Sequence, residues 1–156
     1  MALREILLFG DEALRKKCRP VTKFDERLWE LLDDLTETLM ASEGVGLAAP
    51  QVGILRRVAV VNTRDDSGTI ELINPEIIKE EGHQTGNEGC LSAPNEYSEV
   101  ERPYEVTVKA LDRHGNEFTV KGRELRARAF CHEIDHLDGI LFIDHVKKTL
   151  PPRKGA

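Results

Sequence analysis

The stretch ELRARAFCHEIDHLDG, residues 124–139, decides both the fold and the chemistry of this sequence. Its apolar residues have helical spacing, and Gly139 is the expected stop. On a helix, side chains four residues apart lie on the same face, so the imidazoles of His132 and His136 can reach one metal ion. Glu133 lies between them in angle, within reach of a water on that metal. This HExxH pattern is typical of zinc hydrolases, in which the glutamate moves a proton of the activated water.

A third ligand is needed, and the residues alone leave its identity open. Downstream stand Asp138, Asp144 and His145, none at the spacing of the longer HExxHxxGxxH motif. Upstream stands Cys90, and a cysteine with two histidines leaves the fourth position free for water, as catalytic zinc sites require. The simpler alternatives involve no metal: the two histidines lie on a solvent-exposed face of the helix, and Cys90 is a small buried side chain.

The remaining patterns predict a single α+β domain around this helix. An amphipathic helix is expected over 24–40, with Thr22 and Asp25 as a capping box at its start. Strands are expected at 57–61 and at 69–73, the second ended by Asn74-Pro75, and a hairpin is expected from strands at 106–111 and 118–120. We therefore expect mostly antiparallel or mixed β-sheets packed around a central helix, about 124–137, that carries the HEIDH motif.

Composition fits this class of protein. The chain has 156 residues, of which 40% are hydrophobic and 32% are charged, as in one ordinary globular domain. We expect a catalytic unit at 1–150 and a flexible C-terminal tail at 151–156. A net charge of -6 argues against DNA binding, and three cysteines without framework spacing argue for a reducing compartment. No segment is long and apolar enough for a signal peptide or a membrane span, so we expect a cytoplasmic protein.

The segment GVGLAAPQ, residues 44–51, contains a GxGxxA pattern that also occurs in dinucleotide-binding loops. Such a loop needs a strand before it and a helix after it. Here a predicted helix precedes the pattern and Pro50 follows it. A better interpretation is that the glycines let the backbone approach a ligand closely, while Gln51 supplies an amide donor.

Three segments in this order, GVGLAAPQ (44–51), EGCLS (88–92) and HEIDH (132–136), resemble the signature motifs of peptide deformylase. The similarity extends over nearly the whole chain. The resemblance implies one divalent metal ion per chain, Fe²⁺ in the cell, with Zn²⁺, Ni²⁺ or Co²⁺ in isolated protein. Its ligands would be Cys90, His132 and His136. Glu133 would be the general acid/base, and the amide of Gln51 and the backbone N–H of Leu91 would stabilise the oxyanion.

The resemblance also implies the substrate, N-formylmethionyl peptides and nascent polypeptides, from which the formyl group is removed as formate. The methionine side chain needs an apolar pocket, and the candidate residues are Val45, Gly46, Leu125 and Ala129. Core packing is the alternative for each. A transient contact with the ribosome would follow from the nascent-chain substrate. Only about a dozen residues follow Asp144, so a ribosome-docking role for a longer C-terminal helix cannot be carried over.

A supporting ion pair is expected beside the metal. Glu88 lies two residues before Cys90, so on an extended strand the two side chains share one face. A carboxylate next to a buried metal site needs a partner, and the resemblance suggests Arg102, placed in a turn before the next strand. Arg128 lies one helical turn before His132, and the sequence assigns it no role.

Two other functions compete with this one. A general zinc endopeptidase would cleave internal peptide bonds and would need neither Cys90 nor Gln51. A binding module with a structural metal would close the site with four protein ligands, and no fourth is evident.

Overall fold

The structure is a computed structural model that describes residues 2–146. The expected tail at 151–156 lies outside the described residues. The helices are α1 (Glu26–Met40) and α2 (Leu125–Leu137), with 3₁₀ turns η1 (Glu12–Arg15), η2 (Ala49–Val52) and η3 (Phe142–His145). The strands are β1 (Gly46–Ala48), β2 (Val58–Val61), β3 (Ile70–Glu81), β4 (Gln84–Cys90), β5 (Ala93–Arg102), β6 (Glu105–Leu111) and β7 (Glu117–Arg123).

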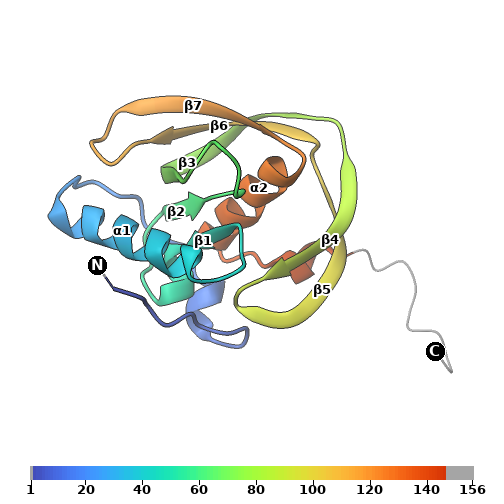
Figure 1. Ribbon diagram of the computed structural model, residues 1–156, viewed down its shortest axis with the longest axis horizontal. Coiled ribbons are helices and arrows are strands. Elements are labelled where there is room, and N and C mark those ends of the chain that lie inside the picture. Colours follow the sequence, from blue (N-terminus) through green and yellow to red (C-terminus); the bar gives the residue numbers. More distant parts are fainter. Residues whose placement is uncertain (1, 147–156) are drawn as a thin grey trace, which may run out of the picture.

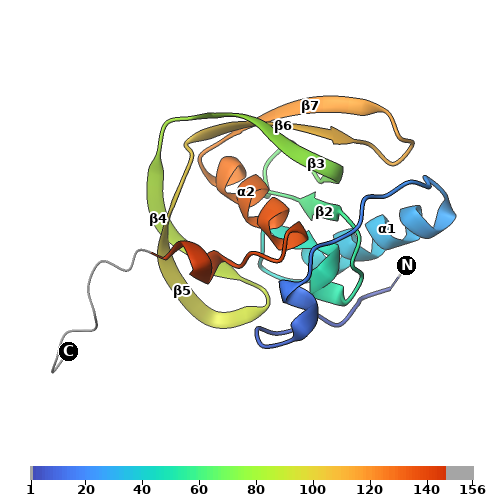
Figure 2. The ribbon, with the colours of Figure 1, turned by 180° about the vertical axis from the view of Figure 1, so that it is seen from behind.

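The strands form two antiparallel sheets around one central helix. Five strands pair in the order β1-β2-β3-β6-β7, and β4 pairs with β5 in a separate two-stranded sheet. Both views show α2 in the middle, with α1 on one side, the β4-β5 hairpin on the other and β3, β6 and β7 above it (Figures 1 and 2). The predicted α+β class and the central HEIDH helix are therefore confirmed. Within residues 2–146, no helix has the length and apolar character that crossing a membrane requires.

Helix α1 begins at Glu26, and its cap differs from the predicted one. The Asp25 side chain accepts a hydrogen bond from the backbone N–H of Leu28, so Asp25 itself is the N-cap and the expected Thr22 capping box is wrong. The predicted apolar face is present. Its fully or nearly buried side chains pack with residues of β1, β2 and β3 in one core cluster, and they are Leu28, Leu31, Leu32, Leu35 and Leu39.

Strand β3 continues past Asn74-Pro75, where the sequence predicted its end. The pairing register with β6 shifts between Ile73 and Glu76, so proline falls at an irregularity where a missing N–H breaks no regular ladder. Asn74 takes a positive φ of 51° and is held by two hydrogen bonds to the backbone of Val21. The turn signal is therefore a bulge within a longer strand.

Helix α2 is buried on nearly all sides, which fixes the position of the HEIDH motif. One face packs against the five-stranded sheet, through residues that include Ala127, Phe130 and Ile134. The other face buries His132 and His136. The helix ends where the sequence predicted, with Asp138 as C-cap and then a glycine at positive φ.

Candidate metal centre and substrate pocket

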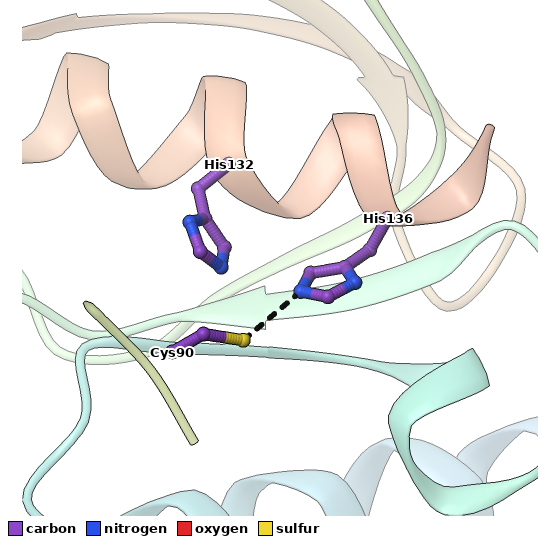
Figure 3. A group of neighbouring side chains, drawn as sticks. All are labelled: Cys90, His132 and His136. Atoms are coloured by element: carbon purple, nitrogen blue, oxygen red, sulfur yellow. Dashed lines mark hydrogen bonds between the residues drawn. The ribbon is translucent and has the colours of Figure 1, made fainter. Parts of the chain in front are cut away.

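Three side chains from two distant segments meet beside α2. His132 and His136 project from the same face of the helix toward Cys90, which is the last residue of β4 (Figure 3). One potential ligand atom from each lies within 4.8 Å of the others, and Cys90 Sγ is 3.3 Å from His136 Nε2. The structure thus brings together the three ligands that the resemblance implied.

The electrostatic surroundings fit a cation at the centre of these donors. Burial holds the pKa of His136 well below its usual range, so its ring is neutral, which is the form that binds a metal. Burial also disfavours a charged His132, yet Glu133, Cys90 and Glu88 together raise its pKa well above the usual value. The same negative surroundings that would hold a proton on His132 favour a divalent ion there.

Glu88 connects the potential metal ligand His132 with the buried side chain of Arg102. One of its carboxylate oxygens is hydrogen-bonded to Nδ1 of His132, which leaves Nε2 of that ring free for a metal. Arg102 forms two hydrogen bonds with the same carboxylate, at 3.0 and 2.6 Å, and a third at 2.8 Å with Asp135. The predicted ion pair is therefore present, with both residues 5% exposed. Burial would raise the pKa of Glu88, but His132 and Arg102 hold it well below its usual range.

Arg102 is not in the turn where the sequence analysis placed it. It is the last residue of β5, and it pairs in register with Gln84 at the start of β4. The β4-β5 hairpin therefore carries Glu88, Cys90 and Arg102 on one two-stranded sheet, and the ion pair ties that sheet to α2 through Asp135.

Glu133 lies between the histidines and is buried, with 3% exposure. Its Oε1 atom has no hydrogen-bond partner among residues 2–146, and burial raises its pKa to about 7. Gly46 of β1 lies directly against it, since a Cβ at position 46 would come within 2.5 Å of Glu133 Oε2. A carboxyl with a free oxygen and a pKa near neutrality can both take and give a proton.

Gln51 and Leu91 lie next to the cysteine. The 3₁₀ turn η2 buries the Gln51 side chain, whose Oε1 accepts from the backbone N–H of Ala48 at 2.9 Å. Its Nε2 consequently faces the β4-β5 turn, 3.0 Å from Ser92 Oγ and 3.5 Å from Cys90 Sγ. Leu91 follows Cys90 in that turn. Both residues therefore lie next to Cys90.

A pocket of about 430 Å³ opens onto this centre. The four residues expected to hold a methionine side chain all line it, together with Cys90, Leu91, His132 and Glu133. They are Val45, Gly46, Leu125 and Ala129. Gln51 is not among the lining residues. The pocket is also lined by Arg128, which sequence reasoning left without a role, although its position four residues before His132 on the helix was a usable signal.

These features define a helix-borne metal site of the HExxH type, with a cysteine from a separate hairpin as third donor and a pocket beside it. Comparison with known proteins identifies the family. The family model for polypeptide deformylase matches residues 3–151, so the chain belongs to that family.

Named relatives agree over nearly the full length. The peptide deformylase of Caldicellulosiruptor bescii is 58% identical over 146 residues, which are 94% of this chain and 87% of the relative. Peptide deformylase 2 of Clostridium acetobutylicum is 52% identical over 151 residues, which are 96% and 99% of the two chains. Among solved structures, the peptide deformylase of Legionella pneumophila matches with a TM-score of 0.90 and 45% identity, over 94% of this chain and 87% of that one.

The expected family, fold class and enzymatic nature are thereby confirmed. The chain is a metal-dependent hydrolase of the family that removes the N-terminal formyl group from nascent polypeptides, and Cys90, His132 and His136 are its potential metal ligands.

Proposed function

We propose that the pocket binds the N-terminus of a formylmethionyl polypeptide, with the formamide beside Cys90 and Glu133 and the methionine side chain between Val45, Leu125 and Ala129. The observation that carries this proposal is the position of the metal-ligand cluster at the wall of that pocket.

Cys90, His132 and His136 would hold the metal ion, which would supply Lewis-acid polarisation of a carbonyl and a lowered pKa for a water. Glu133 takes a proton from the attacking water and delivers it to the amide nitrogen as the C–N bond breaks. The products are formate and a peptide with a free amino group. Gly46 lets the Glu133 carboxyl lie against the backbone of β1, which fixes it at the edge of the pocket.

Negative charge develops on the formyl oxygen during attack. We assign its stabilisation to Nε2 of Gln51 and the backbone N–H of Leu91, which flank Cys90 from two different segments. The amide of Gln51 is oriented in advance, because its oxygen is already held by Ala48. Loss of one such donor typically lowers the rate by about 10²–10³-fold.

Fe²⁺ is the ion we propose in the cell, as the family resemblance implies. One thiolate and two imidazoles also accept Zn²⁺, Ni²⁺ or Co²⁺, so the donor set does not select the metal. Ferrous protein should lose activity in air, because Fe²⁺ and the Cys90 thiolate can both be oxidised, whereas Zn²⁺ has no redox chemistry. Aerobically purified zinc protein with full, oxygen-insensitive activity would contradict this assignment.

One experiment tests the activity and its closest rival together. Protein purified without oxygen is analysed for metal and then assayed for formate release from a formyl-Met peptide and for casein digestion. We expect formate release in proportion to metal content and no casein cleavage. Casein cleavage without formate release would favour the endopeptidase, and formate release that does not depend on metal would refute the proposed site.

The cellular setting follows from the substrate. We propose that residues 1–150 act as one catalytic unit in the cytoplasm, where nascent chains are made, and that contact with the ribosome is transient. Cosedimentation with translating ribosomes, compared with ribosomes stripped of nascent chains, tests the contact.

A further inference from the structure

Arg128 is a buried arginine whose guanidinium is only partly used by the protein. It lies on α2 one turn before His132 and is 8% exposed. Its Nη1 atom donates to Glu88 Oε1 at 2.9 Å and to the backbone carbonyl of Val100 at 3.1 Å. These two bonds fix the orientation of the planar group.

The other edge of the guanidinium, formed by Nε and Nη2, is available to bind a ligand. Its Nε and Nη2 atoms make no hydrogen bond within residues 2–146, yet neither is among the fully buried polar atoms that lack a partner. They therefore retain some solvent exposure, and Arg128 is one of the residues that line the substrate pocket. Gly86 of β4 lies beside Nη2, where a Cβ would come within 3.3 Å of it, so no side chain at position 86 crowds this atom.

Two apolar residues stand beside Arg128 in the wall of the pocket. Leu125 and Ala129 flank Arg128 on α2, and both line the same pocket. Apolar walls recognise the size of a side chain and discriminate weakly between chemical groups of equal size. A charged N–H donor in such a wall adds discrimination by chemical group. A ligand that covers the donor without offering a hydrogen-bond acceptor displaces the water bound to it and leaves the donor unsatisfied, which costs binding free energy.

We infer that Arg128 is a specificity-determining residue that donates a hydrogen bond to the side chain of the N-terminal residue of the substrate. The preferred side chain is as long as methionine and carries an acceptor at the thioether position. A thioether sulfur is a weak acceptor, a sulfoxide oxygen is a stronger one and a methylene group is none. The inference rests on the proposed function, since it assumes that the formyl peptide occupies this pocket.

Three formyl peptides that differ only in the first residue test the inference. The residues are norleucine, methionine and methionine sulfoxide, and kcat/KM is measured for each. We expect the wild-type protein to prefer methionine over norleucine by about five-fold, a modest factor because the acceptor is weak. Arg128→Met should bring that ratio close to one, and it should lower the sulfoxide-to-norleucine ratio by about ten-fold or more.

Ratios between substrates separate recognition from general damage. Arg128→Met also removes one hydrogen-bond partner of Glu88, so the absolute rates of this variant will fall. Loss of metal or of stability, however, lowers kcat/KM for all three peptides by the same factor. Arg126→Met is the matched control, because it removes an arginine of the same helix that pairs with Asp65 and does not line this pocket, and it should leave the ratios unaltered. Arg128→Lys keeps the charge as a second variant and should retain part of the preference for an acceptor.

The outcomes are distinct. Wild-type protein that cleaves norleucine as well as methionine, or an Arg128→Met variant with unaltered ratios, overturns the inference and leaves the activity intact. If Arg128→Met does not fold, the kcat/KM ratios of the three peptides with wild-type protein and with Arg128→Lys test the inference. Calorimetric binding of the three peptides measures the same preference without turnover. Binding that follows the series in protein that releases no formate would support the inference and reject the proposed function.

Discussion

Replacing Gly46 with alanine tests whether the position of Glu133 controls the rate. The new Cβ would lie 2.5 Å from Glu133 Oε2, 2.8 Å from its Cγ and 2.9 Å from its Cδ. An ordinary contact begins near 3.4 Å, so the carboxyl must move by about 0.9 Å. Glu133 is buried and cannot easily swing away. A misplacement of about 1 Å can lower a rate by about 10²-fold, so we expect a loss of that order.

The assay is formate release from a formyl-Met peptide, with metal content and thermal stability measured on the same samples. Gly46 has no positive φ, so alanine adds no backbone strain, and none of the three ligands is touched. Gly122→Ala is the control, since it also has no positive φ and its Cβ would come within 2.8 Å of Arg126 and Phe130, away from Glu133 and the three ligands. Glu133→Gln sets the largest expected loss, about 10²–10⁴-fold, with metal retained. A Gly46→Ala protein with normal metal and normal turnover would refute the reasoning.

Two substitutions and one chemical modification probe the metal centre and its surroundings. Cys90→Ala should abolish metal binding and activity together, and a variant that keeps stoichiometric metal with normal turnover would show that Cys90 is not a ligand. Arg102→Ala should lower metal retention or rate by about 10–100-fold; Arg113→Ala, which removes an arginine paired with Glu71 and Asp33 elsewhere, should do neither. Burial raises the pKa of Cys18 to about 11 and that of Cys131 to about 12, so iodoacetamide at pH 8 should modify only Cys90 in folded metal-free protein, as peptide mass analysis can show.

Elements with a strong local pattern were predictable from the sequence. Helix α2, strand β2 and the β6-β7 hairpin each follow from periodicity or turn residues within a short window, and the structure has them within a few residues of the expected bounds. The boundary of β3 was not predictable in this way. Asn74-Pro75 is a turn signal by composition, and only the contacts of Asn74 with the distant Val21 turn it into a bulge.

The same distinction applies to the candidate site: residues within a short window were predictable, and contacts between segments far apart in the sequence were not. The HExxH pair can be recognised from helical spacing alone, whereas Cys90 could be a buried small residue until the family resemblance links it to the helix. The β4-β5 hairpin escaped prediction because QTGNEGC contains two glycines and few β-branched residues. The position of Arg128 on the ligand face of the helix was predictable, but its contact with Glu88 was not, because Glu88 is forty positions away on that hairpin.

The arrangement around Glu88 explains how a site made from two segments keeps its geometry. One face of α2 carries residues at spacings i, i+4, i+7 and i+8, namely Arg128, His132, Asp135 and His136. The helix fixes these four relative to one another, so the Cys90 segment is the part that needs an external restraint. Glu88 supplies it, because it lies two residues before Cys90 on β4 and contacts both Arg128 and His132. Arg102 completes the cluster, in which two arginines are paired with the carboxylates of Glu88 and Asp135. Any substitution that loosens Glu88 should therefore displace the cysteine and rotate His132 at once, which makes the hairpin, rather than the helix, the place where the metal affinity can be tuned.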